Sequence, residues 1–281
     1  MTLSMKYFTG PILLGAAVAL SGCAGSGDDD PKGKGAPGVP ANAMTITTAN
    51  AAGTLNGAVG NIDMGQSLAE NAMGTVSAPD ITLQAALGLA KKIRQSSNPA
   101  PETATGVTQT DTEICPGGGT VTLSYTETGT SDSGSMVMDK CIEDGFTTNG
   151  IFNFSDTYDT STTAFTLAAS GNLSVTSTDF TFSFNGFDFA ENGNVTSGTY
   201  TITKLTYSID FTTNGSAGGG YLMELTAPIV ESTGGLVSCP ESGAIKITGA
   251  NSTTAELIYN GDGTVTIKAN GVVVDAKAAC F

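Results

Sequence analysis

The sequence predicts a mainly β protein: an antiparallel meander that forms a curved sheet, a sandwich or an open barrel, with one amphipathic helix near the N-terminus. Three observations support this class. From residue 118 onward, apolar side chains alternate with threonine, serine and asparagine, the two-residue period of strands buried on one face. Glycine and asparagine separate these runs. Residues 80–95 instead show the spacing of a helix.

The first 22 residues have the features of an export signal. Lys6 supplies a positive charge ahead of apolar residues 11–20, a stretch too short to span a bilayer as a helix. Leu20-Ser21-Gly22-Cys23 then resembles the lipobox of bacterial lipoproteins. The resemblance implies cleavage before Cys23 and attachment to the membrane through acyl chains on this cysteine. Several acyl chains on one residue give stable anchoring. The alternatives are an ordinary signal peptide that contains a cysteine and, less favoured, a cytosolic protein with an apolar start.

The residues after Cys23 bear on the location. Ala24, rather than aspartate, follows the cysteine, which in the sorting scheme of Gram-negative lipoproteins implies the outer membrane. The run Asp28-Asp29-Asp30 resembles the acidic run of some surface-exposed lipoproteins, although a solvated tether is the simpler explanation. We therefore expect a bacterial cell-envelope protein with a lipid anchor in the outer membrane, facing either the periplasm or the outside.

Composition predicts four parts in the chain. Residues 1–22 are the lipoprotein signal peptide, and residues 23–56 are a flexible tether, because they have too few large apolar side chains to offset the entropy cost of ordering. Order, if present in the tether, is expected in its later part. Residues 57–100 are a helical segment, and residues 101–281 are the antiparallel β domain.

The helical segment contains one strong helix pattern. Asp80 can cap a helix that runs to about Gln95. Its apolar stripe consists of Leu83, Ala86, Leu87, Ala90 and Ile93. Lys91, Lys92 and Arg94 fall in its last turn, where cations complement the helix dipole. We expect the stripe to pack on the sheet, with a partner's groove as the alternative; a weaker helix is predicted around residues 64–72.

The β domain is expected to hold ten to twelve strands. Its alternating runs are Val121/Leu123/Tyr125, Phe165/Leu167, Phe180/Phe182/Phe184, Leu205/Tyr207/Ile209/Phe211, Met223/Leu225, Ile245/Ile247, Leu257/Tyr259 and Val265/Ile267. Tight turns are predicted at Asn149-Gly150, Gly171-Asn172, Asn192-Gly193, Asn214-Gly215 and Gly261-Asp262-Gly263. The alternation changes parity near Lys204 and at Asn185-Gly186, which predicts a β-bulge at each place.

Four cysteines remain after Cys23, and an even number in an exported chain indicates disulfides. They are Cys115, Cys141, Cys239 and Cys280. Three pairings are open, but residues 115–124 and 239–248 align without gaps, and each opens a run of strands that ends near another cysteine. This repetition favours Cys115–Cys141 and Cys239–Cys280. A zinc site is disfavoured because the cysteines lack the close spacing of zinc ligands, and a redox pair because there is no Cys-x-x-Cys.

Residues 141–150, following Cys115-Pro-Gly-Gly-Gly, resemble a pattern of uncharacterised β-rich lipoproteins of Gram-negative bacteria. The resemblance covers about forty residues and implies a fold neighbourhood without an activity.

Composition excludes several functions. There is no histidine, which removes Ser-His-Asp and Cys-His catalysis, histidine metal sites and imidazole pH switches. Arg94 is the only arginine and the net charge is −15, so a phosphate-binding surface for nucleic acid lacks its electrostatic basis. Charged residues make up only 13% of the chain, and its 42 threonines indicate a hydroxyl-covered surface.

Other chemistry has only weak support. The acids weighed for a carboxylate-based glycan hydrolase are Glu113, Asp139, Glu143, Asp144, Asp188 and Glu224, but no pair stands out and there is no tryptophan for a sugar platform. A calcium site is disfavoured, since Asn260-Gly-Asp-Gly263 is explained by turn geometry. We expect no catalytic residue, metal or cofactor.

Phenylalanines gather at Phe180, Phe182, Phe184, Phe187 and Phe189. They are expected to form an ordinary core face, with a surface for a lipid or other hydrophobe as the alternative. The expected function is therefore non-catalytic, structural or binding, at the outer membrane. The alternatives are a periplasmic hydrophobe or lipid carrier and, third, a glycan hydrolase. The expected partners are the membrane, through the acyl chains, and an envelope protein or hydrophobic ligand.

Overall fold

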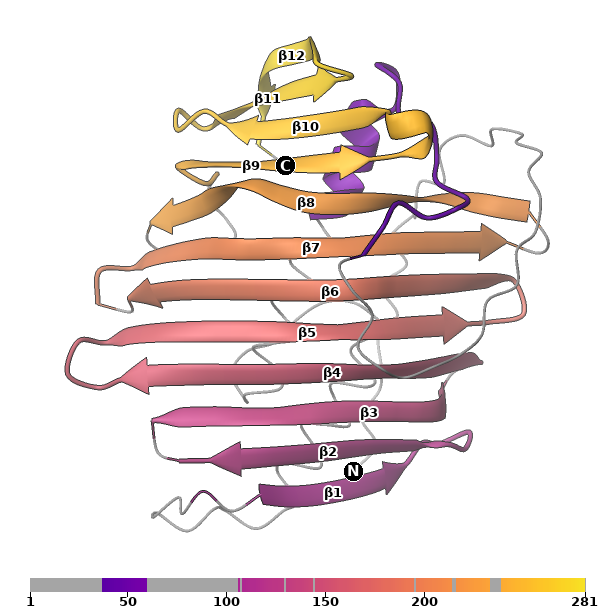
Figure 1. The fold of residues 1–281 in the computed structure, drawn as a ribbon, viewed down its shortest axis with the longest axis vertical. Coiled ribbons are helices and arrows are strands. Elements are labelled where there is room, and N and C mark those ends of the chain that lie inside the picture. The colour runs from indigo at the N-terminus through magenta and orange to yellow at the C-terminus, as the bar shows by residue number, and fades with distance from the viewer. Residues whose placement is uncertain are drawn as a thin grey trace, which may run out of the picture. The chain divides into compact units, whose positions relative to one another are not determined.

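Twelve strands form one open antiparallel sheet, in which each strand pairs with its neighbours in the chain (Figure 1). The computed structural model describes residues 37–59, 106, 108–128, 130–143, 145–194, 196–213, 216–232 and 239–280, all within the compact unit Pro31–Phe281. The strands are β1 (Thr108–Ile114), β2 (Thr120–Glu127), β3 (Ser131–Glu143), β4 (Phe146–Asp159), β5 (Ala164–Thr176), β6 (Phe180–Asn194), β7 (Thr199–Thr213), β8 (Ser216–Ser232), β9 (Ser242–Thr248), β10 (Thr254–Tyr259), β11 (Thr264–Ala269) and β12 (Val272–Ala279). A 3₁₀ turn, η1 (Ala250–Ser252), joins β9 to β10. The predicted fold class, an antiparallel meander, is confirmed.

The alternation of side chains gives the sheet two unlike faces. On the face that we call inner, apolar side chains such as Leu123, Phe152 and Ile245 are buried. The opposite, outer face carries hydroxyls, which form cross-strand pairs: Thr110 Oγ1 lies 3.0 Å from Ser124 Oγ. Such pairs stabilise a sheet by roughly 0.2–1 kcal/mol each. The apolar face holds the core, and the outer face meets water.

The bulge predicted at Asn185-Gly186 is confirmed. Gly171 of β5 pairs with Phe187 and Leu173 pairs with Phe184, so that two residues of β6 oppose one residue of β5. The extra residue turns both Phe184 and Phe187 to the inner face, where each is buried. Without it their odd spacing would place them on opposite faces.

The second predicted bulge, near Lys204, is also confirmed. The register of β7 shifts against β6 beside Lys204 and against β8 between Ile202 and Thr206. Ile202 and Leu205 are consequently both buried on the inner face, despite the odd spacing between them.

Three of the predicted turns are wrong. Asn149-Gly150, Gly171-Asn172 and Asn192-Gly193 lie within β4, β5 and β6. The glycines are required by close contact between strands: a Cβ at Gly150 would lie 2.4 Å from the carbonyl oxygen of Asn172. Two of the asparagines form hydrogen bonds to bulges on neighbouring strands. Asn149 Oδ1 accepts a hydrogen bond from the backbone N–H of Lys140 at 2.8 Å, and Asn172 Oδ1 accepts one from the backbone N–H of Gly186 at 2.8 Å. These pairs fix register instead of ending strands.

Of the two remaining predicted turns, one is confirmed and one lies outside the described residues. Gly261-Asp262-Gly263 joins β10 to β11, as predicted. Asn214-Gly215 lies between β7 and β8 but outside the described residues. The turn from β11 to β12 is Asn270-Gly271, which the sequence analysis missed; both residues have positive φ, 52° and 79°.

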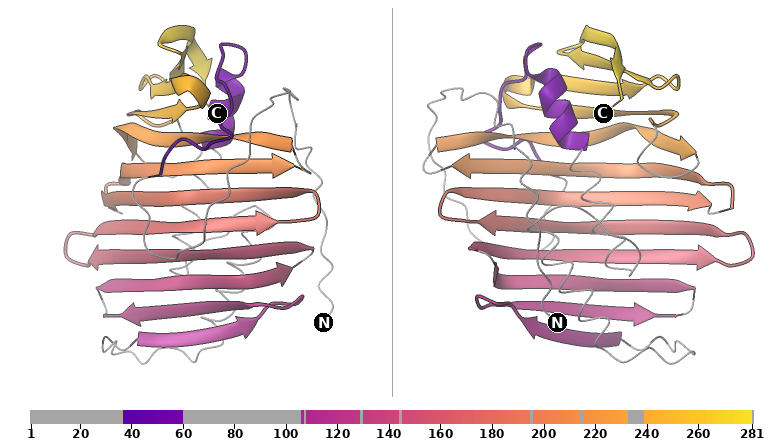
Figure 2. Two further views of the ribbon diagram at one scale, coloured as in Figure 1. Left: turned by 45° about the vertical axis from the view of Figure 1, so that its right-hand side comes forward. Right: turned by 180° about the vertical axis from the view of Figure 1, so that it is seen from behind.

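Residues 37–59, which we call the wrap, pass from the outer to the inner face at the end of β9 (Figure 1). On the outer side Asn42 Nδ2 donates to the carboxylate of Asp210. Met44 then crosses the sheet plane: its N–H donates to the carbonyl of Gly220 at 2.9 Å, and its carbonyl accepts from the N–H of Ala250 at 2.8 Å. A helix at residues 51–59 follows on the inner face (Figure 2, right).

Residues 37–56 lie in the segment predicted as a flexible tether, mostly in its later part, where order was expected if present, and they are ordered against the sheet. Ile46, Ala51, Leu55 and Ala58 are each at most 1% exposed, which supplies the apolar burial that the composition did not suggest. The helices predicted at Asp80–Gln95 and around residues 64–72 lie outside the described residues.

Candidate functional site

The phenylalanine cluster is the largest aromatic group of the inner face in the described part of the chain. Phe184, Phe187 and Phe189 of β6 are at most 1% exposed. The ring of Phe184 lies 5.2 Å from that of Phe187 and 4.7 Å from that of Tyr207 on β7. These spacings are those of favourable aromatic pairs. The bulge of β6 forms this cluster because it places the phenylalanines before it and those after it on the same face.

Phe180 and Phe182 extend the cluster toward the other end of β6, where burial is less complete. Phe180 lies 5.9 Å from Phe146 of β4 and 5.8 Å from Phe211 of β7, between ring centroids. The structure therefore brings all five predicted phenylalanines onto one face. Phe184, Phe187 and Phe189 are buried as in a packed core, whereas Phe180 and Phe182 are only partly buried.

The wrap contacts the aromatic cluster through Tyr207. Tyr207 is fully buried, and its hydroxyl donates a hydrogen bond to the carbonyl of Ala58 at 3.0 Å. This contact joins the end of the described helix to the aromatic cluster. A buried tyrosine needs such a partner for its hydroxyl.

Four acids lie on the inner face at one end of the sheet, where β4, β6 and β8 end and β3 begins. They are Asp132 of β3, Asp156 of β4, Glu191 of β6 and Glu231 of β8, which we call the acidic row. Asp132 and Asp156 face each other directly across β3 and β4. Glu191 pairs with buried Leu167 and is only 7% exposed. None of the four is without an interaction partner.

The acids weighed for catalysis are not gathered into one site. Glu113 and Glu143 have inner-face register positions on β1 and β3, whereas Asp139, Asp188 and Glu224 lie on the outer face, and Asp144 is outside the described residues. Asp188 forms an ion pair of 2.5 Å with Lys204, and Glu224 is paired in register with Lys246. The ion pair explains Asp188 without catalysis, and Glu224 lies opposite a lysine in the sheet.

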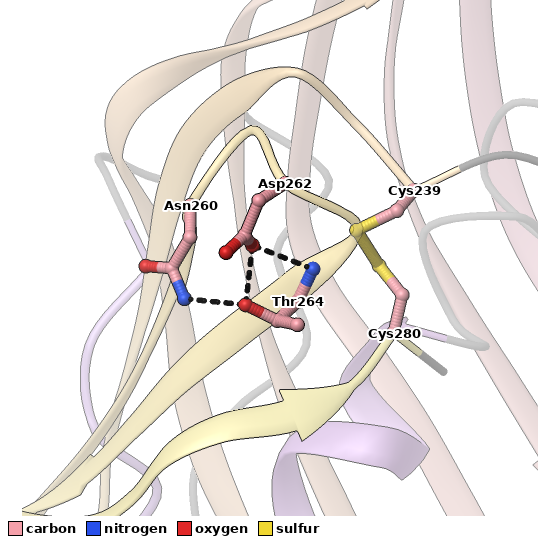
Figure 3. The surroundings of a disulfide bond; sticks show 5 residues. All are labelled: Cys239, Asn260, Asp262, Thr264 and Cys280. Atoms are coloured by element: carbon pink, nitrogen blue, oxygen red, sulfur yellow. Dashed lines mark hydrogen bonds between the residues drawn. A yellow bond between two sulfur atoms is a disulfide. The ribbon is translucent and has the colours of Figure 1, made fainter.

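The turn weighed for calcium is held by its own hydrogen bonds (Figure 3). Asp262 Oδ1 accepts from the backbone N–H of Thr264 at 3.1 Å and from its hydroxyl, and Asn260 Nδ2 donates to the same hydroxyl at 3.0 Å. These bonds lower the pKa of Asp262, with the Thr264 hydroxyl as the largest cause. Among the residues that the structure describes, no group of three or more Cys, Asp or Glu side chains is placed to hold a metal ion.

Both disulfides join the cysteines that the repeated Cys-Pro motif predicts. Cys115 is bonded to Cys141 and Cys239 to Cys280, with Cα–Cα distances of 5.4 and 5.6 Å. The first closes the β2–β3 hairpin. The second spans four strands, β9 to β12, rather than the expected hairpin or three-strand unit (Figure 3). It fixes the C-terminal edge of the sheet to the start of β9.

Strand β12 forms one free edge of the sheet, and its Val272, Val273 and Val274 are 63%, 51% and 40% exposed. Ile114 on β1, the other edge, is 79% exposed. Free edges present backbone groups with which another chain can pair.

Cys23 and the run Asp28-Asp29-Asp30 lie outside the described residues. In the portion that is described, no helix combines the length and the apolar character needed to cross a membrane. Comparison with protein-family models, with curated proteins and with solved structures gives no match.

Proposed function

We propose that this chain is a lipid-anchored protein of the bacterial cell envelope with a non-catalytic, structural or binding role at the outer membrane. The observation that carries the proposal is the division of the five cysteines. Four of them pair with one another, which leaves Cys23 outside both disulfides and at the end of the lipobox-like sequence.

The disulfides support export, because such bonds persist in oxidising compartments such as the bacterial periplasm and the cell surface. Cleavage before Cys23 would remove Lys6 and no acid, leaving 10 basic and 26 acidic residues and a net charge of −16. Such a domain is repelled by anionic headgroups, so the acyl chains rather than the protein surface would hold it at the membrane.

The sheet supports a role without catalysis. The outer face is covered with paired hydroxyls, and the outer carboxylates Asp188 and Glu224 lie beside lysines. The exposed valines of β12 form the surface at which an envelope partner could add a strand.

The second candidate is a carrier for a lipid or other hydrophobe, favoured by the phenylalanine cluster. The burial of Phe184, Phe187 and Phe189 favours the first candidate, because their surface is already occupied. A glycan hydrolase is third, since the candidate acids are dispersed.

Native mass spectrometry and lipid extraction of the protein purified from its membrane separate the first two candidates. A structural or binding protein is expected to carry only its covalent acyl chains. A noncovalent lipid or hydrophobe released in stoichiometric amount, and lost on replacing Phe187 with aspartate but not on replacing outer-face Asp188 with asparagine, would favour the carrier.

A further inference from the structure

Strand β1 forms one edge of the sheet and is regular along its whole length (Figure 1). Among the strands that the structure describes, β2 is its only neighbour. All 7 residues from Thr108 to Ile114 pair with β2 in one unbroken register. An unbroken edge presents an even row of backbone N–H and C=O groups to which another strand can bind. The backbone of β1 is therefore suited to the addition of a strand.

The edge at β12 differs from β1 in geometry and in chemistry. The register of β12 against β11 shifts at two places, and the carboxylate of Asp275 accepts a hydrogen bond from the backbone N–H of Lys277 at 2.9 Å. Bulges of this kind bend an edge and interrupt its row of backbone groups. A strand added to β12 must follow this irregular edge and its exposed valines, so the two edges of the sheet favour different partners.

The inner-face side chains of β1 are acidic, although those of β2 beside them are apolar. Asp111 lies opposite Leu123 and Glu113 lies opposite Val121, and both residues of β2 are buried. Asp111 Oδ2 is also buried, and no described residue donates a hydrogen bond to it. Neither acid forms an ion pair within the described part of the chain. Because a carboxylate oxygen without a partner is unfavourable away from water, this position favours the approach of a cation.

The outer-face side chains of β1 are three threonines and an isoleucine. Thr108, Thr110 and Thr112 each pair with a hydroxyl of β2, at 2.7, 3.0 and 2.9 Å between the oxygens. Ile114, at the end of the strand, is 79% exposed. A strand beside β1 can extend the hydroxyl pairs with threonine or serine, and it can pack an apolar side chain on Ile114.

A second copy of this chain is a poor partner for β1. In an antiparallel pair of two β1 strands centred on Thr112, Asp111 of each copy would lie opposite Glu113 of the other. Like charges directly opposite each other destabilise a sheet, and each copy carries a net charge of −15. Lysine or arginine at the same positions would make the pairs attractive. The charges of β1 therefore favour a basic strand of another protein.

We propose that β1 binds an extended basic segment of an envelope partner, which adds to the sheet as an antiparallel strand. The segment places lysine or arginine opposite Asp111 and Glu113, and threonine or serine opposite the threonines of β1. Its backbone pairs with the edge of β1, as in other cases of strand addition. This inference rests on the proposed binding role and names the surface and the chemistry of the partner.

A capped synthetic peptide, Ile-Lys-Thr-Lys-Thr-Gln-Thr, tests the proposal on the full, disulfide-bonded chain. Antiparallel to β1, it places its isoleucine opposite Ile114 and its lysines opposite Glu113 and Asp111. NMR titration should show saturable binding, with alternate amides of β1 gaining protection from hydrogen exchange and those of β12 gaining none. The same peptide with glutamate in place of both lysines should not bind. Equal binding of the two peptides, or protection of β12 alone, would overturn the proposal.

The charge contact is tested by a double variant that preserves the shape of both side chains. Asp111→Asn/Glu113→Gln should weaken binding of the lysine peptide about tenfold, at about twofold to fivefold for each lost charge pair. The matched control, Asp139→Asn/Glu224→Gln, removes two negative charges from the outer face and should leave the affinity unchanged. An equal loss of affinity in both variants would show attraction by net charge alone and would contradict binding at β1.

The backbone contact is tested by two N-methylated forms of the lysine peptide, one methylated at odd positions and one at even positions. Only alternate N–H groups of a strand face its neighbour, so one form should lose binding and the other should retain it. Equal binding of both forms would exclude strand addition.

Two further outcomes would also reject the proposal. If every amide of β1 is already protected in the free chain and the peptide does not bind, the edge is occupied by the chain itself. A dimer formed through β1, detected by sedimentation equilibrium and by protection of β1 at high concentration, would assign the edge to a second copy. Neither outcome bears on the lipid anchor, which is tested separately at Cys23.

Discussion

The hydroxyl of Tyr207 in β7 donates to the carbonyl of Ala58, 149 residues earlier in the chain, at 3.0 Å. Both residues are fully buried. The bond therefore links the wrap to the aromatic cluster of the sheet. Replacing Tyr207 with phenylalanine leaves the carbonyl without this donor and should lower the free energy of unfolding by about 1–2 kcal/mol. Urea unfolding measures this; an unchanged midpoint would mean that the wrap does not depend on this bond.

Gly249 allows the wrap to cross the sheet. A Cβ at this position would lie 2.2 Å from the carbonyl oxygen of Met44 and 3.0 Å from Ile46 Cγ1. Gly249→Ala should therefore destabilise the protein by about 1–3 kcal/mol through overpacking. The matched control is Gly53→Ala in the helix of the wrap, where a Cβ meets nothing within 4 Å. This change should stabilise the protein by about 0.5–1 kcal/mol. Urea unfolding measures both variants. Equal changes in the free energy of unfolding would contradict the close approach of the wrap to Gly249.

The two disulfides should stabilise different parts of the sheet. On the chain-entropy estimate, each contributes about 3–4 kcal/mol for its loop. Replacing Cys239 and Cys280 with serine should raise hydrogen exchange chiefly in β12, whose side chains are largely exposed. Replacing Cys115 and Cys141 should instead loosen β2 and β3. Uniform loosening of all strands by either pair would show that the sheet unfolds as one cooperative unit without such local roles.

Asp159 gives the protein a specific acid dependence. Its carboxylate accepts hydrogen bonds from the side chains of Ser161 and Thr162 and from their backbone N–H groups, which lowers its pKa from 3.8 to about 2, with the Ser161 hydroxyl as the largest cause. Because the folded pKa is depressed, the stabilisation is fully present above pH 3.8 and is lost as the pH falls toward 2. Carboxyl-carbon NMR titration should give a midpoint near 2. Ser161→Ala/Thr162→Ala should return it toward 3.8; the same low midpoint in this variant would assign the shift to another cause.

The strand pattern and its breaks could be predicted from the sequence, because burial on one face imposes a strict period. An odd spacing between Phe184 and Phe187 leaves a bulge as the only way to bury both. The cysteine pairing followed from an internal repeat. These are local patterns, and they specify local geometry.

The misassigned features depend on contacts between residues far apart in the chain. Gly150 looks like a turn residue, but it is small because the carbonyl of Asn172 lies against it. The helix of the wrap was not predicted because its apolar residues are sparse; the four- and three-residue spacings of Ala51, Leu55 and Ala58 were the signal available. The acidic row was equally hidden, since only the register of β3 with β4 places Asp132 opposite Asp156.

The mass of the mature N-terminus tests the central claim most directly. Intact and peptide mass spectrometry of the protein from its native membrane should show a chain that begins at Cys23 and carries acyl chains on that residue. Labelling with a palmitate analogue should agree and should be abolished by Cys23→Ala. A chain that begins elsewhere, or an unmodified Cys23, would contradict the lipid anchor and with it the proposed place of this protein in the envelope.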